Sequence, residues 1–197
     1  MRQYINMLVF VVILGSVVSF LLVGADLLTK DCIARNDEAL LKSSILDAYD
    51  ISYSFNTVFE RFDETVEEVV IEDTTFYIDK ETNRVSYIFK GSGVWGPIEA
   101  IMTLEADFKT IVSISILAQE ETPGLGGVLA EAWYLEKYSG TVLSDQSPYI
   151  IIRHGNEDNL PNEVDAITGG TRTSEAFMKM VNETYPMYKT LFESRGN

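Results

Sequence analysis

Residues 165–171 read Asp-Ala-Ile-Thr-Gly-Gly-Thr and combine hydroxyl side chains with two adjacent glycines. Apolar residues at helical spacing follow, which predicts that this run leads into a helix over about residues 172–193. The first turn of a helix has unpaired backbone N–H groups and the positive end of the helix dipole, so it favours a phosphate group. Thr171 would present its hydroxyl at that end. An ordinary helix start with Thr171 as the N-cap is the alternative interpretation.

A second run with few bulky side chains, Glu-Thr-Pro-Gly-Leu-Gly-Gly, occupies residues 121–127. Pro123 fixes one backbone φ angle, whereas Gly124 and Gly126 permit a positive φ and the close approach of another group. A planar ring could therefore lie flat against this loop.

Glycines recur in residues 91–98, Gly-Ser-Gly-Val-Trp-Gly-Pro-Ile, with the spacing of a dinucleotide-binding fingerprint. That fingerprint requires a helix directly after the glycines. Beyond Pro97 the apolar residues alternate with a period of two, which predicts a strand, so nucleotide binding is rejected here. We expect a bend between two strands with Trp95 packed on the core. A supporting role of Trp95 beside a cofactor is the alternative.

These three segments resemble, in order and spacing, the motifs of a family of FMN-binding domains. The family includes the G subunit of the Rnf electron-transport complex and the C subunit of the sodium-translocating NADH:quinone oxidoreductase. Its attachment motif is Asp-x-x-Ser/Thr-Gly-Ala-Ser/Thr, and the resemblance implies that FMN is joined through its ribityl phosphate to the last hydroxyl, here Thr171. The Glu-Thr-Pro-Gly-Leu-Gly loop would lie beside the flavin ring. Gly170 departs from the pattern, since the family usually has Ala there.

The resemblance covers about residues 85–190 and the N-terminal segment. It implies that a flavin transferase reads the turn around Thr171, and it implies no catalytic residue and no metal ligand. The residues expected to bind the cofactor are Thr171 (covalent FMN), Asp165, Thr168, Gly169, Gly170, Thr173, Glu121, Thr122, Pro123, Gly124, Leu125, Gly126 and Trp95.

The chain has one histidine and one cysteine, so Ser-His-Asp chemistry and zinc sites have little to draw on. His154 lies in a polar stretch, and we expect a solvated loop residue. Cys32 cannot form an internal disulfide and rules out an iron–sulfur cluster ligated by cysteines of this chain alone. We expect an inert thiol, with an intermolecular or cluster-sharing role as the alternative. An independent enzyme is therefore not expected.

The formal net charge of the chain is −15, and residues 1–25 contain only Arg2 as a charged residue, so the remainder carries −16. Such an acidic domain is a poor partner for nucleic acid or anionic lipid head groups. It also offers no evident cationic cradle for the phosphate of free FMN, because Arg172 is the only basic residue at the attachment motif. A covalent phosphoester removes that difficulty.

Residues 5–25 are apolar over about the length that crosses a bilayer. We expect an uncleaved single-pass anchor in the inner (cytoplasmic) membrane; a cleaved signal peptide is the alternative. The resemblance implies that the domain lies on the extracytoplasmic side. The expected division is residues 1–25 as N-terminus and anchor, 26–65 as a helical membrane-proximal connector and 66–197 as the covalent FMN-binding domain.

The expected fold class is α+β, because strand runs mix with helices without regular alternation. Helices are predicted over residues 26–49, 51–65, 128–138 and 172–193, the last kinked or interrupted by Pro186. Strands are predicted over residues 69–71, 76–78, 85–89 and 149–152, with a hairpin of 98–104 and 110–117. In the second arm of that hairpin Val112, Ile114 and Ile116 are expected to face the core.

The function expected from the resemblance is that of a membrane-anchored flavoprotein subunit. Its covalent FMN would relay electrons among the other membrane subunits of an Rnf-type, ion-translocating ferredoxin:NAD oxidoreductase complex. The short chain favours the Rnf G subunit over the longer quinone-reductase C subunit, which is one alternative. A stand-alone extracytoplasmic module, serving another reductase with its flavin or acting as a non-flavinylated receptor, is the other.

Overall fold

The computed structural model describes residues 2–155 and 160–195, in two compact units, Met1–Leu40 and Leu41–Asn197. Helix α1 (Arg2–Ala48) forms the described part of the first unit and continues into the second. Its apolar stretch has a mean hydropathy of 2.8 over 18 residues, none of them buried, and is long and apolar enough to cross a membrane. A signal sequence meets the same criterion. The predicted helix over residues 26–49 is confirmed as a continuation of this one.

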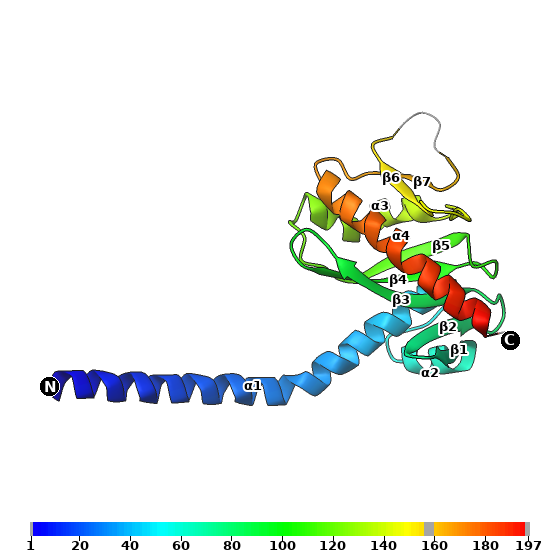
Figure 1. Ribbon diagram of the computed structural model, residues 1–197. Helices are drawn as coiled ribbons and strands as arrows, with labels where there is room; N and C mark the ends of the chain where they lie inside the picture. Colours follow the sequence, from blue (N-terminus) through cyan, green and yellow to red (C-terminus); the bar gives the residue numbers. More distant parts are fainter. Residues whose placement is uncertain (1, 156–159, 196–197) are drawn as a thin grey trace. The chain divides into compact units, whose positions relative to one another are not determined.

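The second unit is an α+β domain, which confirms the predicted fold class. Helix α2 (Val58–Thr65) precedes strands β1 (Val66–Ile71), β2 (Thr74–Asp79), β3 (Val85–Ser92), β4 (Pro97–Leu104) and β5 (Ile111–Ala118). The strands form one antiparallel sheet in the order β1-β2-β3-β4-β5, each joined to the next by a short connection (Figure 1). The predicted strands over 69–71, 76–78 and 85–89 and the hairpin of 98–104 and 110–117 are confirmed.

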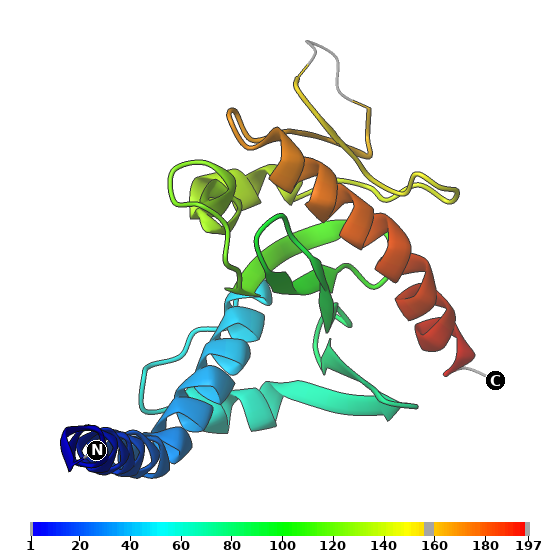
Figure 2. The same cartoon turned by 60° about the vertical axis from the view of Figure 1, so that its left-hand side comes forward.

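Helix α4 (Thr171–Ser194) lies across one face of this sheet (Figures 1 and 2). Phe177 and Tyr185 of α4 are fully buried, as are Tyr87 and Phe89 of β3. Burying a side chain of this size contributes about 1.5–3 kcal/mol. Packing of α4 on the sheet therefore fixes where its N-terminus lies.

Two predicted helices differ from the structure. Residues 51–57 are not helical, because Thr57 and Ser54 bond to each other: the Ser54 N–H donates to Thr57 Oγ1 (2.9 Å) and the Thr57 N–H to the Ser54 carbonyl (2.9 Å). Residues 128–138 form three short pieces, η1 (Gly126–Ala130), α3 (Ala132–Leu135) and η2 (Glu136–Tyr138). The extended backbone of Glu131 breaks the run, and its pieces bury Leu129, Tyr134 and Tyr138.

In β5 the prediction that Val112 faces the core is wrong. A register shift between Thr103 and Leu104 pairs them with Ser113 and Ile111, so Val112 lies in an irregularity of the ladder. Ile111 takes its place in the core, while Ile114 belongs to the core and Ile116 packs against it.

A short parallel pair completes the domain, β6 (Ile151–Arg153) with β7 (Glu163–Asp165). The predicted strand over 149–152 is thus displaced by two residues at its start. Pro186 lies inside α4 without interrupting it. Of the predicted kink or interruption, the interruption is wrong, because residues on both sides, Tyr185 and Phe192 among them, pack against the core.

Candidate functional site

The three glycine-containing segments, far apart in sequence, meet at one pocket of about 330 Å³ at the N-terminus of α4. Both views in Figures 1 and 2 show this end of α4 beside the segment that carries η1 and α3. The lining residues are Val94, Trp95, Glu121, Thr122, Leu125, Gly126, Gly169, Gly170, Thr171, Arg172 and Thr173. Nine of the predicted cofactor residues therefore lie together.

Glu121 joins the three segments through one buried carboxylate. Oε1 accepts hydrogen bonds from the backbone N–H of Val94 (2.7 Å) and of Trp95 (3.2 Å). Oε2 accepts one from the Thr173 hydroxyl (2.6 Å) in the first turn of α4. The residue is only 5% exposed, and a buried carboxylate is tolerated only when hydrogen-bonded in this way. Glu121 therefore holds the segments in position.

Glycine is required at Gly126 because of this arrangement. A Cβ there would lie 2.3 Å from Thr173 Oγ1 and 2.6 Å from Glu121 Oε2. Gly124 has a φ of +74° and open space around it, so it serves the turn rather than a close contact. Three glycines, Gly126, Gly169 and Gly170, thus line the pocket together with bulkier residues, which is compatible with the flat-ring interpretation of this loop.

Close packing explains the glycine at position 170, where the family usually has alanine. A Cβ at this position would lie 2.7 Å from Cγ2 of Ile167, which is itself buried. In this chain the turn before α4 is packed too closely for an alanine unless Ile167 shifts.

Thr171 is the first residue of α4, and Gly170 is the N-cap, with no side-chain capping hydrogen bond. The alternative in which Thr171 caps the helix is therefore wrong. Its exposed side chain points its hydroxyl toward His154, with Oγ1 3.2 Å from Nε2. Because the first-turn N–H groups of a helix have no intrahelical partner, negative charge at Thr171 is favoured.

Arg172 follows Thr171, lines the same pocket and is exposed. It forms no ion pair with any residue that the structure describes. A phosphate ester suits the helix terminus, the Thr171 hydroxyl and this guanidinium. A planar ring suits the glycines that line the pocket. The residues present therefore fit an FMN group.

Trp95 is 71% exposed, so the prediction that it packs on the core is wrong. The Gly93 N–H donates to the Gly96 carbonyl (2.8 Å), which closes a tight turn that contains Val94 and Trp95. Trp95 lines the pocket instead, in agreement with the alternative of a place beside a cofactor.

Four predicted residues do not line the pocket: Asp165, Thr168, Pro123 and Gly124. Asp165 lies in β7 and its carboxylate is 3.7 Å from the Lys137 ammonium. Thr168, Pro123 and Gly124 are exposed in the turns on either side. These four residues lie in the same segments as residues that line the pocket.

His154 lies exposed in the bend after β6, as expected of a solvated loop residue, but its contact with Thr171 was not predicted. Its contact with Thr171 depends on the parallel pairing of β6 and β7, which aligns Arg153 with Asp165. Strand β7 was not predicted. No local pattern around His154 indicates this contact.

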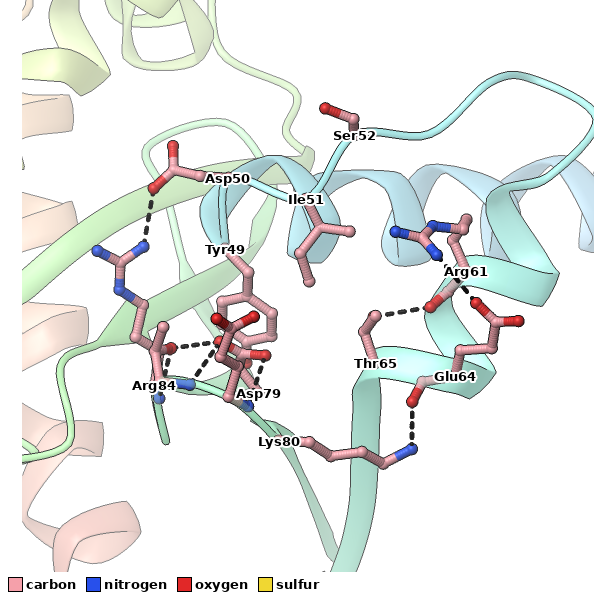
Figure 3. A pocket seen from close by; sticks show the side chains of 12 residues that line it. Tyr49, Asp50, Ile51, Ser52, Arg61, Glu64, Thr65, Asp79, Lys80 and Arg84 are labelled. Carbon is pink, nitrogen blue, oxygen red and sulfur yellow. Dashed lines mark hydrogen bonds and ion pairs between the residues drawn. The ribbon is translucent and has the colours of Figure 1, made fainter.

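A larger cavity, of about 810 Å³, lies elsewhere in the domain, between the residues after α1, α2 and the β2–β3 turn (Figure 3). Its three cationic side chains are all engaged. Arg84 pairs with Asp50 (2.9 Å) and Glu105 (3.3 Å), and Arg61 with Glu64 (3.0 Å). Lys80 donates to the carbonyls of Asp63 (3.0 Å) and Glu64 (2.8 Å) at the end of α2. The contacts of Lys80 and Arg84 join structural elements, whereas the Arg61–Glu64 pair lies within α2, and all three cations are directed at the protein itself.

The fold and the pocket define an α+β domain with a glycine-containing pocket at the N-terminus of its long helix. Residues 93–185 match the family described as FMN-binding domain, which confirms the resemblance inferred from the motifs.

The relatives of the chain are subunits of membrane complexes. It is 32% identical over 105 residues to the C subunit of the Na(+)-translocating NADH-quinone reductase of Yersinia pestis, covering 52% of this chain and 40% of the relative. It is 31% identical over 119 residues to the G subunit of the Na(+)-translocating ferredoxin:NAD(+) oxidoreductase complex of Acetobacterium woodii, covering 58% and 55%. The aligned part thus spans about half or less of these relatives.

Solved structures share the fold. NqrC of Shewanella oneidensis superimposes with a TM-score of 0.66 at 17% identity, covering 77% of this chain and 93% of that one. The C subunit of the Na(+)-translocating NADH-quinone reductase of Parabacteroides distasonis gives a TM-score of 0.65 at 18% identity, covering 78% and 92%.

Proposed function

We propose that this chain is a membrane-anchored flavoprotein subunit that holds FMN through a phosphoester to Thr171 and relays electrons within an ion-translocating, Rnf-type oxidoreductase complex. The observation that carries the proposal is the convergence of the three motif segments on Thr171 in one pocket. The matching family and the relatives support the flavin, and the names of the relatives support a complex.

The bound FMN supplies the electron chemistry, accepting and passing on electrons. The protein positions it. The α4 N-terminus and Arg172 stabilise the negative phosphate diester, the backbone around Gly126 leaves room for a flat ring, and Trp95 offers an aromatic face at the rim. Glu121 holds these segments in position relative to one another.

The remaining expectations complete the proposal. Residues 1–25 anchor the chain, 26–65 form the membrane-proximal connector and 66–197 the flavin domain on the extracytoplasmic side. A flavin transferase reads the exposed turn with Thr168 and Gly169 and modifies Thr171. The other membrane subunits of the complex, and not nucleic acid, are the partners of the acidic domain.

The second candidate is the C subunit of the sodium-translocating NADH:quinone oxidoreductase, because several curated relatives and both solved structures described above carry that name. Purification of the tagged chain from its host under mild detergent separates the two. Mass spectrometry of the associated membrane subunits identifies one complex or the other, and recovery of the chain alone contradicts both.

Substitution of the acceptor residue tests the attachment. Thr171→Ala, produced in cells that contain a flavin transferase, should show no flavin fluorescence after denaturing electrophoresis, whereas the wild type fluoresces. Thr171→Ser is the matched control, because it keeps a hydroxyl, and it should retain part of the signal. Fluorescence in Thr171→Ala would place the flavin on another residue.

A further inference from the structure

The end of β6 lies against the start of α4, although the two are separated by a long loop in the sequence. In the parallel pair, Arg153 is in register with Asp165, and the Ala166 N–H donates to the Arg153 carbonyl (2.8 Å). The chain then turns through Gly169 and Gly170 into α4. This path places His154 next to Thr171, with 3.2 Å between Nε2 and Oγ1.

The charged groups around His154 come from three other elements. Asp165 of β7 lies against the neighbouring Gly155, where a Cβ would be 2.3 Å from its Oδ1. Lys137 of η2 pairs with Asp165, and Arg172 of α4 follows Thr171. Arg153 is occupied by its ion pair with Glu163. The imidazole is thus the only titratable base in contact with the hydroxyl among the described residues.

We propose that His154 is the proton acceptor when flavin is attached to Thr171. This inference rests on the proposed function and assigns a chemical role to a residue of the acceptor protein itself. A hydroxyl is a weak nucleophile, and a neighbouring neutral imidazole is the usual group that activates it.

The step needs an activated phosphoryl donor, and a flavin dinucleotide such as FAD, presented by the transferase, is of the required class. Thr171 Oγ1 attacks the phosphorus on the flavin side of the pyrophosphate. The Oγ1–P bond forms, the bond from that phosphorus to the bridging oxygen breaks, and AMP leaves with the electron pair. The hydroxyl proton passes to His154 Nε2, and no group is oxidised or reduced.

The test follows the attachment rate. The unmodified full chain, produced without a transferase and held in detergent, is mixed with FAD and a limiting amount of purified transferase. Flavin incorporation is followed by in-gel fluorescence and intact mass. His154→Gln should lower the initial rate about 100-fold, the lower end of the usual contribution of a general base.

Lys179→Gln is the matched control, since Lys179 is an exposed cation further along α4 that pairs with Glu183. It should incorporate flavin at the wild-type rate. Equal rates for His154→Gln and the wild type would overturn the inference.

The pH profile separates a base from a merely structural residue. Only a neutral imidazole accepts a proton, so the wild-type rate should fall at acidic pH. With the same transferase, His154→Gln should lose this acidic limb. Parallel profiles for the two proteins would contradict the proposal.

A chemical variant avoids any folding defect of the substitution. Because the chain has a single histidine, treatment of the folded wild type with diethyl pyrocarbonate should block attachment, and hydroxylamine should restore it. If the blocked protein is flavinylated normally, His154 is not the base. If instead the untreated wild type acquires no flavin at all, the proposed function fails and not this inference.

Discussion

Two cavities of the domain differ in what their side chains are free to do. The larger, of about 810 Å³, is lined by Arg61, Lys80 and Arg84, each bound to a carboxylate or a carbonyl (Figure 3). The smaller, of about 330 Å³, is lined by glycines, an exposed tryptophan and a hydroxyl at a helix N-terminus. Volume alone would favour the first.

The difference shows that the chemistry of a cavity depends on which of its polar side chains are left available to a ligand. In the larger cavity Arg61 and Arg84 pair with carboxylates, and Lys80 joins the end of α2 to the residue after β2. In the smaller, one buried carboxylate, Glu121, satisfies the backbone while Arg172 and Thr171 face the open space. The first cavity is expected to matter for stability, and the second for cofactor binding.

The largest effect on this comparison is expected from Glu121→Gln. The neutral amide loses the charge-assisted bonds to Val94, Trp95 and Thr173, so the variant should lose about 1–3 kcal/mol of stability and perturb the flavin absorption spectrum. Chemical denaturation and visible spectroscopy measure both. Glu120→Gln, at the exposed neighbouring position, should change neither. An unchanged flavin absorption spectrum in Glu121→Gln would contradict the role of Glu121 in holding the pocket segments in position.

Arg84→Gln tests the larger cavity. Arg84 is 20% exposed and bridges Asp50, Glu105 and the Ala48 carbonyl, so its loss should cost about 1–2 kcal/mol. Flavin incorporation should remain at the wild-type level. Arg61→Gln, whose ion pair is more exposed, should cost less than about 0.5 kcal/mol. Loss of flavin from folded Arg84→Gln would contradict the division of roles.

The smallest effect concerns the strand pair next to the pocket. The hydrogen bond from Arg153 lowers the pKa of Glu163 below its ordinary value of 4.5. The resulting stabilisation is complete above that value and is lost as the pH falls through the lower folded pKa. Unfolding measured between about pH 3 and 6 should therefore show a weaker pH dependence in Glu163→Gln than in the wild type. Identical pH slopes would mean that the pair contributes nothing.

The parts of the fold that follow local patterns were predictable. Strands β1 and β2 contain short apolar runs, and β3 to β5 have alternating apolar residues, with turn residues between the strands. Helix α4 shows a helical period from Ala176 to Leu191. Residues 128–138 have the same helical period, but the extended Glu131 and the burial of Tyr134 and Tyr138 override it. The irregularity at Val112 is likewise set by the partner strand β4.

The site was predictable to the extent that glycines and hydroxyls carry the motifs. Trp95 was misplaced because an exposed tryptophan contradicts the usual preference for burial, and such exceptions concentrate where a ligand is bound. The contact of His154 with Thr171 could not be predicted, because it depends on β6 and β7, two strands of three residues each.

Covalent attachment of FMN to Thr171 is best tested by intact-mass measurement of the protein from its native host, followed by peptide mapping. We expect an added mass equal to FMN less one water, on the peptide that contains Thr171. An unmodified mass in cells with an active flavin transferase would contradict it.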